Sequence, residues 1–114
     1  MNSKQKGKRG ELELSHYLIS KGFDAHRGVQ YKGSPDSPDV VGLKGIHIEC
    51  KRVEALNIEK AMLQAKHDAG DDEIPVVMHR KNREGWKVTM DIDDWLNFYA
   101  RWSDDSDGSD IETV

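Results

Sequence analysis

Two acidic residues and one lysine stand in an otherwise apolar stretch of the chain, PDVVGLKGIHIECK, which covers residues 38–51. Asp39 lies at one end of the stretch, and Glu49 and Lys51 lie at the other. The stretch is rich in Val and Ile and has a glycine near its middle, which is typical of two short strands joined by a tight turn. A β-hairpin could therefore bring the three charged side chains together.

The length of the turn decides which side chains share a face of this hairpin, because a shift of one residue sends every side chain to the opposite face. A two-residue turn at Lys44 and Gly45 would need a positive φ at Lys44, which a lysine adopts reluctantly, and would turn Asp39 away from Glu49. A three-residue turn over residues 43–45 needs a positive φ only at Gly45. We therefore predict the longer turn, which places Asp39 opposite Glu49.

In this register the two faces of the hairpin differ in character. Asp39, Glu49 and Lys51 share one face, and the other face carries Val40, Gly42, Ile46, Ile48 and Cys50, with Val40 opposite Ile48. Two opposed carboxylates destabilise a hairpin unless a positive group lies between them. Oxygen ligands favour Mg²⁺, with Mn²⁺ as a substitute, and no convincing Cys/His set for Zn²⁺ is present. The alternative is an ordinary charged face on which Lys51 bridges the two acids.

Lys51 completes a set of groups that could cleave a phosphodiester. It could orient or help deprotonate a water molecule, or it could stabilise charge that develops on a phosphate. Glu11 lies on the apolar face of the predicted first helix and could bring a third carboxylate to the site, or it could act only as a cap or a partner of the helix dipole. The sequence thus predicts metal-assisted hydrolysis, with Asp39, Glu49, Glu11 and the backbone carbonyl of Cys50 as metal ligands.

The hydrophobic pattern predicts the elements that position these side chains. Helices are expected at residues 10–20, 57–69 and from 91 onward, with caps at Asn57 and Asp91 and glycine ends at Gly22 and Gly70. Further strands are expected at residues 23–27, 74–79 and 86–90, and residues 28–37 form an irregular loop. On the last helix, Ile92, Trp95, Leu96 and Tyr99 are expected to face inward. This order predicts an α/β fold with a mixed five-stranded sheet flanked by helices.

The composition is that of one globular domain with a tail. At 114 residues the chain has room for a single modest core, which we assign to residues 1–102, and the acidic residues 103–114 lack the apolar surface to fold. No apolar run could span a bilayer, and the start, MNSKQKGKRGELEL, has no apolar region typical of a secretory signal. The single cysteine cannot form an internal disulfide. We therefore expect a cytoplasmic protein.

Charge is distributed unevenly along the chain. The net charge is −4, but five of the 21 acidic residues lie in the last twelve positions, which leaves 16 acidic against 17 basic groups in residues 1–102. Two basic clusters stand out, and they contain Lys6, Lys8 and Arg9, and Arg80, Lys81 and Arg83. They could bind nucleic acid, or they could be a frayed end and a solvated turn.

The motifs together resemble a nuclease family. Pro38-Asp39 followed by Glu49-Cys50-Lys51 resembles the PD-(D/E)XK nuclease superfamily. The combination of KGKRGELEL, KGFDAHRG, YKGS, PDVVGL, IHIECK and LQAK is similar to the Holliday junction resolvases of archaea, bacteriophages and prophages. The similarity covers about residues 4–100, although Leu12 stands where archaeal relatives usually carry a basic residue and the acidic tail is outside the pattern.

This resemblance implies a Mg²⁺-dependent homodimer that cuts branched DNA such as a four-way junction, in the host cytoplasm if the protein is phage-encoded. Glu11, Asp39, Glu49 and Lys51 match the catalytic residues of the family. Arg27 and Ser34 match positions that contact DNA, and the predicted DNA-binding set also includes Lys32, Arg52 and Gln64 with the basic clusters above. The alternatives are a nuclease of the same fold acting on flaps, nicks or single-strand ends, and a DNA-binding protein without activity.

The positions of three further side chains relative to the site follow from the helix and strand patterns. Gln64 lies at the edge of the apolar face of the second helix and could point at the site or into solvent. The five histidines lack the spacing of metal ligands, but His47 shares the face of Glu49 and could touch DNA or the rim of the site. The side chain of Cys50 is expected to be a small buried group.

Overall fold

The predicted order of helices and strands is confirmed by the computed structural model, which describes residues 3–28 and 38–105. The elements are α1 (Ser3–Ser20), β1 (His26–Arg27), β2 (Val40–Val41), β3 (Ile46–Arg52), α2 (Ile58–Asp68), β4 (Ile74–Arg80), β5 (Lys87–Thr89) and α3 (Ile92–Asp105). None of the helices in these residues has the length and hydropathy that a membrane span requires.

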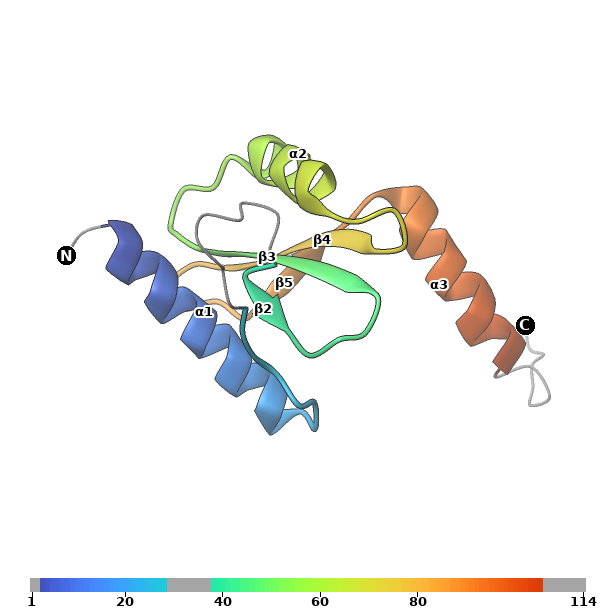
Figure 1. Cartoon of the computed structure of the whole chain (residues 1–114), viewed down its shortest axis with the longest axis horizontal. Coiled ribbons are helices and arrows are strands. Elements are labelled where there is room, and N and C mark those ends of the chain that lie inside the picture. Colours follow the sequence, from blue (N-terminus) through green and yellow to red (C-terminus); the bar gives the residue numbers. More distant parts are fainter. Residues whose placement is uncertain (1–2, 29–37, 106–114) are drawn as a thin grey trace.

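The strands form one mixed sheet of five strands in the order β1-β2-β3-β4-β5. The pairs β1/β2, β2/β3 and β4/β5 are antiparallel, whereas β3 and β4 are parallel and are connected through α2. In Figure 1, α1 lies against one side of the sheet and α2 lies against the other. The predicted α/β architecture with flanking helices is therefore confirmed.

Each face of the sheet is buried by one helix. Leu14 and Leu18 of α1 pack on a cluster composed of Ala25, Val40, Ile48, Cys50 and Val76. On the other face, Val77 packs against the buried side of α2, which consists of Ala61, Met62 and Ala65. Because neighbouring residues of a strand point to opposite faces, the adjacent Val76 and Val77 serve the two cores. The alanines allow α2 to lie close to the sheet.

The hairpin between β2 and β3 has the register that the three-residue turn predicts. Val40 pairs with Ile48, and the amide of Asp39 donates to the carbonyl of Ile48 at 2.9 Å. Gly45 has a φ of +83°, and in the described part of the chain Arg83 is the sole residue other than glycine with a positive φ, so Lys44 avoids that conformation. The turn therefore places Asp39 opposite Glu49, with Glu49 on the face that α2 covers.

Several boundaries differ from the predictions. The helix α1 begins at Ser3 rather than at residue 10, because the Lys, Gln and Arg residues of this segment favour helix and outweigh one interior glycine. β1 is restricted to His26–Arg27, β4 extends to Arg80, and β5 covers only Lys87–Thr89. Asn57 caps α2 by accepting from the amide of Lys60, as expected. The loop predicted at residues 28–37 lies almost entirely outside the described residues.

The prediction that the apolar side of the last helix faces inward is wrong. In α3 no residue is buried, and the exposed fraction is 69% for Ile92, 51% for Trp95, 46% for Leu96 and 49% for Tyr99. Figure 1 shows the reason, because α3 extends away from the sheet. An amphipathic pattern predicts that one side of a helix is apolar and packs against another surface. It does not identify that surface. The helix also includes residues 103–105, which we had assigned to the tail.

We predict opposite effects for two glycine substitutions in α1. A Cβ at Gly10 would lie 2.7 Å from the Cβ of Arg52 on β3, whereas a Cβ at Gly7 would meet no atom within 4 Å. Gly10→Ala should lower the free energy of unfolding by about 1–3 kcal/mol through overpacking. The matched control, Gly7→Ala, should raise it by roughly 0.5–1 kcal/mol through helix propensity. Urea denaturation measures both, and a Gly10→Ala protein as stable as wild type would contradict the close approach.

Candidate active site

Asp39 and Glu49 form the centre of the candidate site. They project from neighbouring strands, Asp39 just before β2 and Glu49 within β3. The Oδ2 atom of Asp39 accepts a hydrogen bond of 2.8 Å from the amide of Cys50, which fixes the carboxylate against β3. Glu49 is almost fully buried, with an exposed fraction of 7%. The sheet thus holds one carboxylate by its backbone and buries the other beneath α2.

Lys51 provides the positive charge nearest to Glu49. Its Nζ atom lies 3.7 Å from Oε2 of Glu49, and 37% of the lysine side chain is exposed. The separation is that of a weak ion pair, and the exposed part of the lysine side chain leaves room for a substrate to approach. The predicted proximity of these two side chains is therefore present in the structure.

Burial and mutual repulsion hold these acids at unusual pKa values. Burial, followed by the charge of Asp39, raises the pKa of Glu49 to about 7, and Lys51 only partly opposes this shift. Burial also raises the pKa of Asp39, although the hydrogen bond from Cys50 and the charge of Lys51 lower it. The protein alone therefore leaves the two carboxylates insufficiently neutralised.

Glu11 reaches the same neighbourhood from α1. Burial raises its pKa, the hydrogen bond from Arg27 lowers it, and the charge of Asp39 raises it further. The Nε atom of Arg27 donates to Oε1 of Glu11 at 3.0 Å. Arg27, which the resemblance assigned to DNA contact, thus holds the carboxylate of Glu11 at the edge of β1.

The donor chemistry of the predicted ligands suits a hard divalent cation, although among the described His, Cys, Asp and Glu side chains only His47, Glu49 and Asp68 bring three ligand atoms within 4.8 Å of one another. Asp39, Glu49 and Glu11 offer oxygen atoms, and their carboxylates carry a repulsion that a cation would offset. The thiol of Cys50 is excluded from this set, because it is buried in the core beneath α1, as predicted, and burial raises its pKa. The Cys50 carbonyl remains a predicted ligand.

Besides Arg27, two further arginines of the predicted DNA-binding set are engaged within the fold. The Nε atom of Arg52 donates to Glu13 at 2.7 Å, and an Nη atom of Arg80 donates to the other oxygen of Glu13 at 2.9 Å. These bonds connect β3 and β4 to α1. Among the remaining members of the predicted set, Lys8, Arg9, Lys81 and Arg83 are exposed. Lys32 and Ser34 lie outside the described residues, as does the side chain of Lys6.

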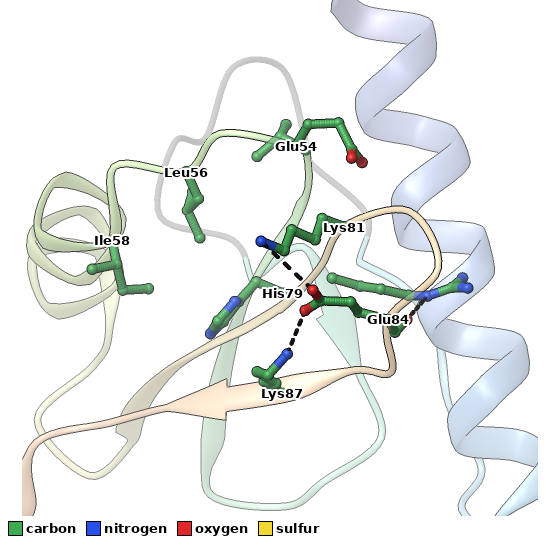
Figure 2. A pocket seen from close by; sticks show the side chains of 9 residues that line it. Glu54, Leu56, Ile58, His79, Lys81, Glu84 and Lys87 are labelled. Carbon is green, nitrogen blue, oxygen red and sulfur yellow. Dashed lines mark hydrogen bonds and ion pairs between the residues drawn. The ribbon is translucent and has the colours of Figure 1, made fainter.

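A pocket of about 290 Å³ lies beside the second basic cluster. It is lined by Val53, Glu54, Leu56, Ile58, His79, Arg80, Lys81, Glu84 and Lys87. Figure 2 shows Lys81 and Lys87 on either side of Glu84, at 3.6 Å and 2.8 Å from its carboxylate oxygens. This acid neutralises part of the charge of the RKNR turn. The pocket does not contain the carboxylates of the candidate site.

Two buried residues, His47 and Asp68, lie next to Glu49. The sequence interpretation placed His47 on the face of Glu49 without predicting its burial, and it missed Asp68. His47 has an exposed fraction of 0%, so the expectation that it touches DNA or the rim of the site is wrong. Asp68, in the last turn of α2, is also buried, and it accepts a hydrogen bond of 2.6 Å from Gln64. Gln64 therefore points toward this cluster although its residue is exposed. The signal was available, since Ala61, Ala65 and Asp68 follow helical spacing on the buried side.

The comparisons with known proteins agree with the resemblance. The family model described as archaeal Holliday junction resolvase (hjc) matches residues 2–93. A solved structure, that of Hjc from Archaeoglobus fulgidus, described as a Holliday junction resolvase from an archaeal hyperthermophile, is 27% identical with a TM-score of 0.56. The similarity covers 72% of this chain and 74% of that one. A comparison with curated proteins found no significant match.

We expect the metal-free protein to lose stability as the pH rises from about 4.5 to about 7. The folded pKa of Glu49 is about 7, above its ordinary value, so the folded state retains a proton that the unfolded state has released. The free energy of unfolding then falls with pH, by on the order of 3 kcal/mol from this group. Urea denaturation in EDTA measures the loss.

Glu49→Gln should remove most of this pH dependence, because the amide does not titrate. Glu59→Gln changes an exposed acid on α2 and serves as the matched control, which should keep the wild-type dependence. An unchanged pH dependence in Glu49→Gln would show that the carboxylate is not destabilised in the folded protein.

Proposed function

The chain belongs to the family of archaeal Holliday junction resolvases, and we propose that Asp39, Glu49 and Lys51 form its catalytic centre, with Glu11 beside them. As a member of this family it is a structure-specific endonuclease that hydrolyses DNA and resolves branched junctions, and its activity depends on metal ions. The observation that carries the proposed centre is the pair of opposed carboxylates, Glu49 buried and Asp39 half-buried, with an ammonium group 3.7 Å from Glu49.

We assign Mg²⁺ as the physiological cofactor, with Mn²⁺ as a substitute. Asp39, Glu49, Glu11 and the carbonyl of Cys50 would hold it, since hard cations prefer oxygen ligands. When bound, such a cation polarises a phosphate oxygen and lowers the pKa of a water molecule. The protein itself provides the orientation, because the amide of Cys50 fixes Asp39 and Arg27 fixes Glu11.

Lys51 has a separate role in this proposal. Its ammonium group is partly exposed next to Glu49, so it can approach the scissile phosphate while remaining within the cluster. There it would stabilise the negative charge that develops on the phosphate oxygens, or orient the attacking water. Its charge also lowers the pKa values of Asp39 and Glu49 and so supports the ionised ligand set.

DNA binding would rely on a small number of exposed basic residues. Lys8 and Arg9 lie on α1, and Lys81 and Arg83 lie in the turn between β4 and β5. Because Arg52 and Arg80 are bonded to Glu13, they contribute less free charge to the surface than the sequence indicates. We therefore expect a shallow salt dependence of junction affinity, because its logarithmic slope is proportional to the number of phosphates that the protein neutralises.

We propose that the protein acts as a homodimer assembled through α3. Resolution needs paired incisions in two strands, and a two-fold symmetric pair supplies two equivalent sites. The apolar side of α3 is available for this interface, with Trp95 stacked on Tyr99 at a centroid distance of 5.6 Å and Trp102 63% exposed. An isologous interface would bury this row of aromatic residues.

We expect Asp39→Asn and Glu49→Gln to lower cleavage of a mobile four-way junction by at least about 100-fold, because each change removes a charged ligand. Binding of the junction should persist. Asp71→Asn replaces an exposed acid and should cleave like wild type. Gel assays with Mg²⁺ on the junction, a flap, a nicked duplex and a linear duplex give both rate and substrate preference. Near wild-type cleavage by both variants would refute the assignment.

Substitutions that place a charged residue among the aromatic side chains of α3 test the proposed dimer interface. Trp95→Glu and Trp102→Glu should shift the mass measured by light scattering at micromolar concentration from dimer to monomer. Leu63→Glu is the matched control, because Leu63 is 67% exposed but lies on α2, and this variant should remain dimeric. A wild-type protein that is monomeric with and without junction DNA would contradict the proposal.

A further inference from the structure

We propose that His47, Glu49 and Asp68 form a second cation site, which takes a first-row transition metal such as Mn²⁺ or Zn²⁺ and shares Glu49 with the catalytic centre. The site lies between β3 and the last turn of α2. It extends the proposed function, but the binding of metal there does not depend on the identity of the catalytic residues.

Three potential ligands converge in the protein interior. One ligand atom from each of His47, Glu49 and Asp68 lies within 4.8 Å of the others. The exposed fractions of the three residues are 0%, 7% and 8%. His47 and Glu49 are two positions apart on β3 and therefore point to the same face, where α2 delivers Asp68. Buried carboxylates and an imidazole rarely gather in this way without a common partner.

His47 lacks the partner that a buried imidazole needs. Neither ring nitrogen has a hydrogen-bond partner among the residues that the structure describes. The nearest acid outside the cluster is Glu73, whose Oε1 lies 3.5 Å from Nδ1 of His47, too long for a good hydrogen bond. Buried polar side chains are nearly always satisfied, so this one requires a ligand, and a metal ion in the cluster provides it.

Asp68 is oriented as a metal-binding carboxylate usually is. Gln64 donates to its Oδ2 at 2.6 Å, and Nδ1 of His67 lies 2.9 Å from its Oδ1. Such outer hydrogen bonds fix the direction of a ligand and are common around metal centres. Each carboxylate oxygen has two lone pairs, so both retain the capacity to bind a cation. Gln64 thus acquires a role in positioning Asp68.

The donor set indicates the class of metal. A single imidazole with two carboxylates suits Mn²⁺, Zn²⁺ or Fe²⁺, whereas Mg²⁺ favours oxygen ligands and its own waters. Ligand distances of about 2.0–2.2 Å allow two ligand atoms to lie at most about 4.4 Å apart. The observed separation of up to 4.8 Å therefore closes with shifts of a few tenths of an ångström. Because Glu49 is common to both sites, an ion here would restrict the motion of a carboxylate that the catalytic centre also uses.

The test measures metal binding directly, on the full chain with MnCl₂ as the only added divalent metal. Asp39→Asn weakens the catalytic centre and leaves all three ligands of the second site in place. We expect this variant to bind Mn²⁺ and to show coupling between Mn²⁺ and an imidazole nitrogen in pulsed electron paramagnetic resonance. His47→Gln in the same background should lose the nitrogen coupling, and His16→Gln, which changes an exposed histidine, should keep it.

Asp68→Asn provides a second test that does not alter the histidine. In the Asp39→Asn background it should weaken Mn²⁺ binding at least tenfold by calorimetric titration, and circular dichroism checks that it folds. Absence of nitrogen coupling in Asp39→Asn, or retention of full affinity in Asp68→Asn, would overturn the site. Both outcomes are independent of cleavage, so loss of junction cleavage in Asp39→Asn would still identify the catalytic centre.

Discussion

The structure depends on placing two carboxylates opposite each other on paired strands and then shielding them from water, Glu49 almost completely and Asp39 in part. Asp39 and Glu49 repel, and burial disfavours the charge of both. The fold offsets part of this cost with one backbone amide, one lysine and, for Glu11, one arginine. What remains is a deficit of positive charge at a defined place, and a cofactor of the right charge can bind there strongly for this reason.

The other charged residues explain how the site keeps its shape. Glu13 accepts from both Arg52 and Arg80, so the same helix that carries Glu11 is fastened to β3 and β4 next to the site. This close docking of α1 requires glycine at position 10, because a Cβ there would lie 2.7 Å from the Cβ of Arg52. Internal use of these arginines also limits the positive charge on the surface of a domain that is near neutral. Precise positioning and strong electrostatic attraction for DNA thus compete for the same residues.

The hairpin and the sheet could be predicted because their determinants are local. The preference of Gly45 over Lys44 for a positive φ fixed the register, and the register brought Asp39, Glu49 and Lys51 together. The helical spacing of Ala61, Ala65 and Asp68 indicates the buried side of α2. Which strand residues that side covers, and therefore the burial of His47, depends on how α2 crosses the sheet. The exposed apolar side of α3 was misassigned for the same reason. Its periodicity is genuine, but no described residue of the chain buries it.

The contact between Glu13 and Arg80 has a consequence for the order of assembly. It joins residues 67 positions apart, whereas the hydrogen bond from Cys50 to Asp39 spans only 11. Closing a longer loop costs more chain entropy, so docking of α1 is the more demanding step. The opposed carboxylates can meet in a partly formed sheet, but Glu11 joins them only when α1 is seated. A chain still emerging from the ribosome therefore lacks a complete site, and the capacity to cut appears with the final fold.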